Sequence, residues 1–160
     1  MNILRLWLCL LLTTPVFADT LAGDGFRVNV PTATIPQPDH STIGKTRCTS
    51  YVMETAAGTY MVMYNDFPEA PKDALAALRG SRNGAMRDIH GEVESEKVDP
   101  WQGFPALAFR FTGQNKKMRG RALFVMVQKR IYQIVLMGTL TNSYETPEAE
   151  DFFGSFRPLP

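Results

Sequence analysis

The sequence lacks the combinations of side chains on which most catalytic and metal sites depend. Its 160 residues include two cysteines and two histidines, with neither paired cysteines nor a His-Glu-Xaa-Xaa-His motif to hold zinc. His40 and His90 each lie in a polar stretch without a second ligand at metal spacing. Cys48 fits a small buried apolar strand residue better than a nucleophile paired with a histidine, and Ser155 lies outside the Gly-Xaa-Ser-Xaa-Gly pattern of serine hydrolases. We therefore predict no catalytic residues, no cofactor and no enzyme activity.

An excess of one charge and a long apolar run are also missing. Lys and Arg number 17 against 16 Asp and Glu, a net charge of +1. The apolar run at residues 6–12 is shorter than the roughly 20 residues that cross a bilayer. It follows Arg5 and precedes Pro15 and the small residue Ala18, which is the layout of a secretory signal peptide. We expect cleavage after Ala18, export to the periplasm or the outside of the cell, and no stable membrane insertion afterwards.

Removal of residues 1–18 would leave a single domain at residues 19–160. Arg5 is the one charged residue removed, so 17 minus 1 basic residues would face 16 acidic ones. This balance argues against a nucleic-acid partner. Cys48 would be the sole cysteine, because Cys9 lies in the leader, and no internal disulfide could form. A chain of this length buries one hydrophobic core, so packing has to hold the domain together.

The strongest pattern in the chain predicts a hairpin at residues 121–138. Two runs rich in Val, Ile, Leu, Phe and Tyr meet at Gln128-Lys129, which favours antiparallel strands with Val127 opposite Arg130. In this register one face carries Leu123, Val125, Val127, Tyr132, Ile134 and Leu136, and the other carries Phe124, Met126, Ile131, Val135 and Met137. Because both faces are apolar, the hairpin has to lie in the centre of a sheet that is covered above and below.

Two helices are predicted as these covers. The first, at residues 71–89, begins with Pro71 and carries an apolar stripe at helical spacing, namely Leu75, Leu78, Ala85, Met86 and Ile89. Gly80 and Gly84 predict either a break in this helix or a close approach to its support. The second helix starts at Thr146-Pro147-Glu148 and presents Ala149, Phe152, Phe153 and Phe156.

Shorter alternating segments supply the rest of the predicted sheet. Strands are expected at residues 26–30, 47–54, 59–65, 91–98 and 106–111, and residues 19–25 are expected to form a linker. Glu92, Glu94 and Glu96 alternate, so we expect them on one solvated strand face. The fold class that follows is α+β, with a single antiparallel β-sheet flanked by helices on both faces.

Taken in order, these segments resemble a known family. The chain has Gly-Phe-Arg-Val-Asn-Val-Pro near its start, then a Tyr-rich hairpin, a helix, Gly-Phe-Pro-Ala-Leu, Arg-Ala-Leu-Phe-Val, Arg-Ile-Tyr-Gln-Ile and a closing Phe-Phe-Gly-Ser-Phe. This order looks like the small exported domains of the PsbP and Mog1-like superfamily. The resemblance covers nearly the whole mature chain and consists of packing motifs. It implies an α/β/α sandwich and a non-enzymatic accessory or chaperone-like role, with no family active site.

The expected function is that of an exported, non-catalytic binding or accessory module that contacts a protein partner or an apolar segment in the cell envelope. Trp101 and Phe104 form an aromatic pair on a loop, of the kind that recognition loops present, or else plug that loop against the core. Arg119 and Arg121 belong to a basic cluster before the hairpin, which is either a solvated face or a surface that docks the partner.

A periplasmic copper-handling protein is the alternative. Met53, Met61 and Met63 are the candidate ligands, because thioethers are soft donors that suit Cu(I). Met61 and Met63 share a strand face, and Met53 lies on the neighbouring strand. Methionine is also an adaptable filler of cores, and core filling is the favoured interpretation of these positions.

Overall fold

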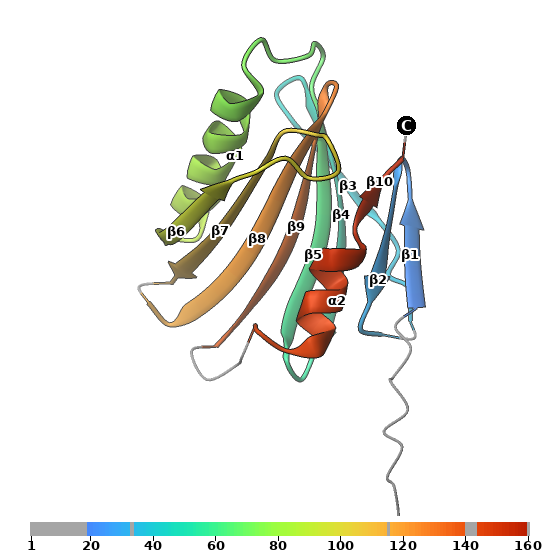
Figure 1. Ribbon diagram of the computed structural model, residues 1–160, viewed down its shortest axis with the longest axis vertical. Helices are drawn as coiled ribbons and strands as arrows, with labels where there is room; N and C mark the ends of the chain where they lie inside the picture. Colours follow the sequence, from blue (N-terminus) through green and yellow to red (C-terminus); the bar gives the residue numbers. More distant parts are fainter. Residues whose placement is uncertain (1–18, 33, 115, 140–143, 160) are drawn as a thin grey trace, which may run out of the picture.

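The computed structural model describes residues 19–32, 34–114, 116–139 and 144–159, and in these ranges the chain forms ten strands and two helices. The strands make a three-stranded sheet in the order β1-β2-β10 and a seven-stranded sheet in the order β3-β4-β5-β9-β8-β7-β6 (Figure 1). The strands are β1 (Asp19–Gly23), β2 (Phe26–Val30), β3 (Asp39–Ile43), β4 (Thr46–Thr55), β5 (Gly58–Asp66), β6 (Glu92–Val98), β7 (Ala106–Gly113), β8 (Met118–Val127), β9 (Arg130–Thr139) and β10 (Arg157–Pro158). The helices are α1 (Ala74–Asp88) and α2 (Pro147–Ser155).

The β8–β9 hairpin has the predicted register and lies at the centre of the larger sheet. Val127 pairs with Arg130 and Leu123 with Ile134, and β9 is the middle strand of the seven. Gln128 adopts a φ of 54°, the positive value that tight hairpin turns use. The side chains of the hairpin divide between two hydrophobic clusters, one on each face of the sheet. The inference that this hairpin is buried on both sides is therefore confirmed.

The expected single sheet with helices on both faces is wrong. One face is covered in part by α1, which packs on β7 and β8. The other face is covered by α2 together with the three-stranded sheet, which lies beside α2 (Figure 1). Leu21 and Phe26 of this small sheet belong to the same buried cluster as Phe152 of α2 and Tyr132 of β9. The second cover thus consists of strands as well as a helix, and the molecule is mostly β.

The small sheet was missed because its first strand carries almost no pattern. Residues 19–25, the expected linker, contain β1, in which Leu21 alone is buried. Leu21 pairs with Val28 of β2, and Gly25 supplies a φ of 77° for the turn between the two strands. Pairing with β2, rather than its own alternation, makes this segment a strand, and pairing partners cannot be read from a five-residue stretch.

The second helix begins where the sequence predicts, at Thr146-Pro147, whereas α1 begins at Ala74, three residues after the predicted start at Pro71. Asp73 caps α1 by accepting a hydrogen bond from the Ala76 amide at 2.9 Å, and Thr146 caps α2. The predicted break or close approach at Gly80 and Gly84 is wrong. The helix is continuous, and no atom of another element lies within 4 Å of the position that a Cβ would take at either glycine. These glycines therefore weaken α1 by about 1 kcal/mol each relative to Ala without kinking it.

A β-bulge overturns the expected common face of Glu92, Glu94 and Glu96. The register between β6 and β7 shifts after Val93, which turns the following side chains over. Glu96 consequently forms a salt bridge to Arg79 of α1 at 2.7 Å. Glu94 instead lies 3.5 Å from Arg119 of β8. The carboxylates of Glu94 and Glu96 therefore lie on opposite faces of the sheet.

Residues 1–18, which carry the predicted signal peptide and its cleavage point, lie outside the described residues. Within the described ranges, neither helix has the length and apolar character needed to cross a membrane.

Candidate functional site

An apolar groove opens beside α1 on the face of the sheet that this helix covers only in part. α1 packs on β7 and β8, whereas β9, β5 and β4 continue the same face beyond it. The groove is lined by Met61, Met63, Ala85, Met86, Asp88, Ile89, Phe109, Phe111, Ala122, Phe124, Gln133, Val135 and Met137. Asp88 and Gln133 are the two polar residues of this lining. We refer to these residues as the methionine groove.

Strand alternation places the methionines in the groove. Along β5, Tyr60, Val62 and Tyr64 are buried in the cluster under α2. Met61 and Met63 point the opposite way and are only partly buried. A sheet interior would normally be closed by another element at these positions, so the partial exposure of two large apolar side chains marks a part of the sheet that lacks a cover.

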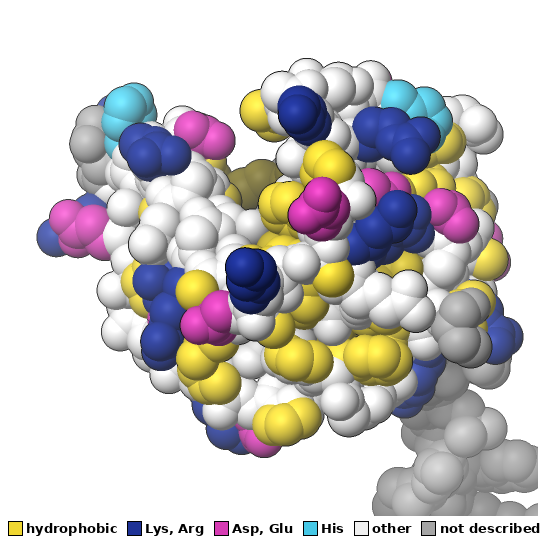
Figure 2. Space-filling model, turned by 90° about the horizontal axis from the view of Figure 1, so that it is seen from above, with side chains coloured by type: hydrophobic (Ala, Val, Ile, Leu, Met, Phe, Trp, Pro, Cys, Tyr) yellow, Lys and Arg dark blue, Asp and Glu magenta, His cyan; other side chains and the backbone are white. Residues whose placement is uncertain are grey.

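The methionine groove is large enough for a side chain of another molecule. Its volume is about 190 Å³, whereas an apolar cavity of roughly 150 Å³ suffices to bind benzene. Met61, Ile89 and Met137 also line a more open depression of about 490 Å³ that extends to Val52 on β4, and Val52 is 43% exposed. Viewed from above, the outline of the molecule shows a recess with hydrophobic side chains at its floor (Figure 2).

The three methionines proposed as copper ligands are not brought together. Met53 pairs with Tyr60 and is buried in the cluster under α2, whereas Met61 and Met63 face α1 on the other side of the sheet. Among the described residues, no group of three His, Cys, Asp or Glu side chains could hold a metal ion. The thioethers that do share the groove are those of Met61, Met63, Met86 and Met137.

The predicted partner-binding residues all have internal contacts. Trp101 packs against the core under α2, and its Nε1 donates a hydrogen bond to the carbonyl of Phe156 at 3.1 Å. Phe104 packs on the same cluster and pairs with Trp101 through backbone hydrogen bonds of 2.8 and 3.0 Å. The pair therefore plugs its loop. Arg121 forms a salt bridge to Glu150 and stacks on the ring of Phe153 at 4.5 Å, and Arg119 pairs with an acidic residue of β6.

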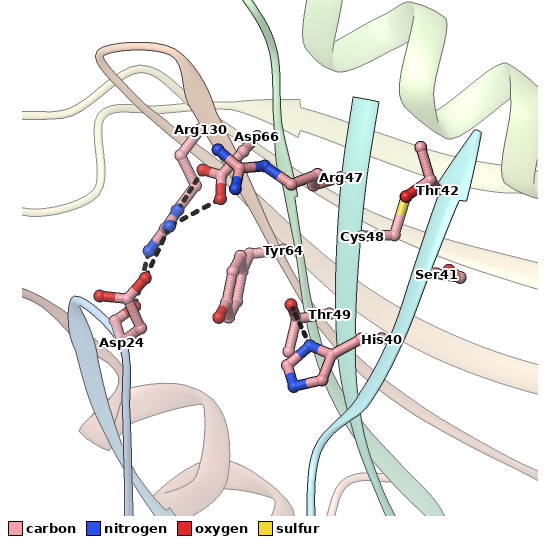
Figure 3. Close-up of a pocket in the computed structure, with 10 residues that line it drawn as sticks. All are labelled: Asp24, His40, Ser41, Thr42, Arg47, Cys48, Thr49, Tyr64, Asp66 and Arg130. Atoms are coloured by element: carbon pink, nitrogen blue, oxygen red, sulfur yellow. Dashed lines mark hydrogen bonds and ion pairs between the residues drawn. The ribbon is translucent and has the colours of Figure 1, made fainter. Parts of the chain in front are cut away.

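A polar network lies on the α2 face, at the end of the sheet that holds the β3–β4 and β8–β9 turns (Figure 3). Arg130 donates from Nε and Nη2 to the two carboxylate oxygens of Asp66, at 2.6 and 2.8 Å. It also donates to the carboxylate and the carbonyl of Asp24, at 2.9 and 2.7 Å. Its guanidinium carbon lies 4.1 Å from the ring centroid of Tyr64. The hydrogen bonds to Asp66 raise the pKa of Arg130 above its already high ordinary value, so this side chain stays charged and ties the small sheet to the large one.

The same network contains a buried tyrosine. The Tyr132 hydroxyl donates to the carbonyl of Gly25 at 2.8 Å, across the boundary between the two sheets. Burial raises the pKa of Tyr132, and the neighbouring Arg130 opposes part of that rise.

Cys48 is only partly buried rather than buried as predicted, and it does not form a thiol–imidazole pair with His40. In the register of β3 with β4, Cys48 pairs with Ser41 and Thr49 pairs with His40. Because successive residues point to opposite faces, the thiol and the imidazole project to opposite sides of the sheet. Nδ1 of His40 lies 3.1 Å from Oγ1 of Thr49 instead. His40 is therefore not placed to activate the thiol.

Comparisons with known proteins find structures of similar fold but do not assign this chain to a family. No family model and no curated protein matches this chain. A crystal structure of a protein from Bacteroides thetaiotaomicron VPI-5482 is 10% identical, with a TM-score of 0.52 over 89% of this chain and 49% of that one. The chain thus spans about half the length of that protein, with which it shares the fold.

Two structures from Pseudomonas aeruginosa are similar at lower scores. PA94, a protein of unknown function, is 13% identical with a TM-score of 0.43 over 79% of this chain and 85% of that one. The T6SS immunity protein TplEi, solved in complex with an "L" peptide, is 15% identical with a TM-score of 0.36 over 85% of this chain and 59% of that one. At these scores neither structure bears on the function of this chain.

Proposed function

We propose that this protein is an exported, non-catalytic binding module that holds an apolar segment of a partner protein in the methionine groove. The observation that supports this function best is the incomplete cover of the sheet, which leaves Met61, Met63 and Met137 partly exposed above a hydrophobic floor. Methionine side chains are flexible and polarisable, so a surface built from them adapts to different apolar sequences. The lining offers hydrophobic contact and few polar groups, which suits binding rather than chemistry.

The width of the uncovered face favours a helix as the bound segment. Three neighbouring strands, β9, β5 and β4, remain beside α1 at the level of the groove, because β3 pairs only with residues 46–50 of β4. With strands about 4.8 Å apart, their axes span about 10 Å, close to the roughly 10 Å diameter of a helix with its side chains. A helix laid next to α1 would bury Met61, Met137 and Val52 together, as amphipathic helices do in hydrophobic grooves.

Site-specific photo-crosslinking in the producing cell tests this function. A photoreactive phenylalanine analogue at Met137 should yield a discrete crosslinked protein, and the same analogue at the exposed Lys97 of β6 should not. Met61→Glu should suppress the product because a carboxylate would have to be buried with the apolar segment, whereas Met61→Leu should preserve it. Equal crosslinking from Met137 and Lys97, or a product insensitive to Met61→Glu, would contradict the proposal.

Export and family membership belong to the same proposal. The layout of residues 1–18 supports export, and the resemblance to PsbP and Mog1-like domains supports an accessory role. That membership stays a prediction, because no family model matches and the similar structures carry other descriptions.

Cu(I) binding is a second candidate function, with a different set of ligands from the one expected. The sharing of one groove by Met61, Met63, Met86 and Met137 favours it, since thioethers suit Cu(I). Titration of the purified protein with Cu(I) distinguishes the two functions. Met61→Leu keeps the groove apolar and removes a thioether, so it should abolish copper binding and leave crosslinking intact. Met53→Leu is the matched control on the opposite face.

A further inference from the structure

Three cations gather at one end of the large sheet without acidic partners. Lys45 and Arg47 come from the β3–β4 hairpin, and Lys129 comes from the β8–β9 turn. All three are exposed, and none forms an ion pair or a side-chain hydrogen bond within the described ranges. Together with Arg130 they line a recess of about 370 Å³, which we call the end recess. It lies at the end of the sheet that holds the β3–β4 and β8–β9 turns, and none of its lining residues lines the methionine groove.

The nearby carboxylates are already engaged. Both oxygens of Asp66 accept hydrogen bonds from Arg130, and the carboxylate of Asp24 accepts another. Arg47 is the cross-strand neighbour of Asp66, and Figure 3 shows its guanidinium on the other side of that carboxylate from Arg130. Among the described residues no hydrogen bond or ion pair joins Arg47 to Asp66, so the five N–H donors of Arg47 are not used by that carboxylate.

The charge that remains defines the class of ligand. Lys45, Arg47, Lys129 and Arg130 contribute four positive charges to the lining of the recess, and Asp66 contributes one negative charge. Asp24, which pairs with Arg130 from outside the lining, offsets one more, so an excess of two positive charges remains. The whole chain carries a net charge of +1, so the excess of positive charge is concentrated at the end recess and is not spread over the whole surface. A guanidinium and two ammonium groups around a cavity match the oxygens of a dianion, as in phosphate recognition by Arg and Lys.

We propose that the end recess binds a phosphate group, with Arg47 as its main hydrogen-bond donor and Lys45 and Lys129 as flanking charges. The neutralised Arg130–Asp66 pair forms a rigid floor beneath it. The backbone hydrogen bond from Phe67 to the carbonyl of Lys129, 2.9 Å long, holds the β8–β9 turn against the end of β5 and so fixes the separation of the cations. This inference does not depend on the function proposed for the methionine groove.

Titration with inorganic phosphate at low ionic strength, followed by amide NMR shifts, tests the site. Saturable shifts are expected around Lys45, Phe67 and Lys129, and they should weaken as salt screens the charges. Arg47→Gln and Lys129→Gln should each weaken binding about fivefold, since each removes one positive charge near a dianion. Lys116→Gln, which changes a turn lysine at the other end of the sheet, should leave binding unchanged.

The source of the phosphate is resolved with vesicles. Phosphatidylcholine vesicles with and without phosphatidic acid are compared in a flotation assay. Binding of free phosphate alone assigns the site to a small phosphate ester, and flotation that free phosphate competes away assigns it to a lipid headgroup. Either result supports the site. The proposed phosphate site is overturned if neither free phosphate nor the phosphatidic acid vesicles bind, or if Lys116→Gln weakens binding as much as Arg47→Gln does.

Discussion

Replacement of Arg130 by Met should destabilise the protein by about 3 kcal/mol. The side chains of Arg130 and Asp66 are 17% and 20% exposed, so their ion pair lies between a fully buried and a surface pair. Removal of one member of a buried pair costs about 3–5 kcal/mol, and a surface pair contributes about 0–1 kcal/mol. Loss of the ion pair between Arg130 and Asp66 should therefore cost about 2 kcal/mol. The contact with Asp24, which is 73% exposed, adds under about 1 kcal/mol, and the lost stacking on Tyr64 adds about 0.5 kcal/mol.

Urea denaturation of purified variants measures this loss. Arg121→Met is the matched control, because Arg121 also pairs with a carboxylate and stacks on a ring but its partner Glu150 is 59% exposed. It should lose about 1 kcal/mol or less. Addition of Asp66→Asn to Arg130→Met should recover part of the loss, since the unpaired carboxylate is then neutral. A loss below 1 kcal/mol for Arg130→Met, or one equal to that of Arg121→Met, would refute the assignment of Arg130 as the tie between the two sheets.

Three further predictions concern the turns, the tyrosines and the leader. Gly58→Ala should destabilise the protein, because φ of Gly58 is 143° and an added Cβ would lie 2.6 Å from the carbonyl oxygen of Met137. Gly80→Ala, in the interior of α1, should stabilise the protein by up to about 1 kcal/mol. The urea midpoints of the two variants are compared with that of the unchanged protein. Burial raises the pKa of Tyr60 and Tyr132 in the folded protein above the unfolded value of about 10. Both hydroxyls therefore contribute their full stability below about pH 10, where they are neutral in both states. This contribution is lost as the pH rises through the folded pKa values. Denaturation at pH 8 and above pH 10 should show the fall, and Tyr60→Phe should reduce it. Fractionation and N-terminal sequencing should find an exported chain that begins at Asp19, and a cytoplasmic chain that begins at Met1 would contradict export.

The elements with strong periodicity were predictable from the sequence, and the elements that depend on distant pairing were not. The β8–β9 hairpin and the apolar stripe of α1 follow from local alternation and spacing. The three-stranded sheet does not, because β1 is a strand through its pairing with β2, and β10 adds two residues from the far end of the chain. A second helix was therefore expected to cover a face that a helix and a small sheet cover together.

The candidate sites, too, were predictable where they follow from local alternation and not where they depend on contacts between distant segments. The orientation of Met61 and Met63 toward the α1 face follows from alternation along β5. The groove that they line also depends on where α1 packs, which leaves this part of the sheet uncovered. The face of Met53 could have been worked out, because the turn that Gly58 closes sets Met53 opposite Tyr60. The end recess brings together residues 45–47 and 129–130, which no local pattern connects.

Paramagnetic relaxation of the methionine methyl groups by a soluble gadolinium chelate tests the central claim, an open groove between α1 and the sheet, most directly. The methyl signals of Met61, Met63 and Met137 should be strongly broadened, whereas that of Met53, which is 4% exposed, should be protected. Protection of all four methyl groups to the same extent would mean that the sheet is covered on both faces in solution, and the binding function proposed for this groove would then lose its basis.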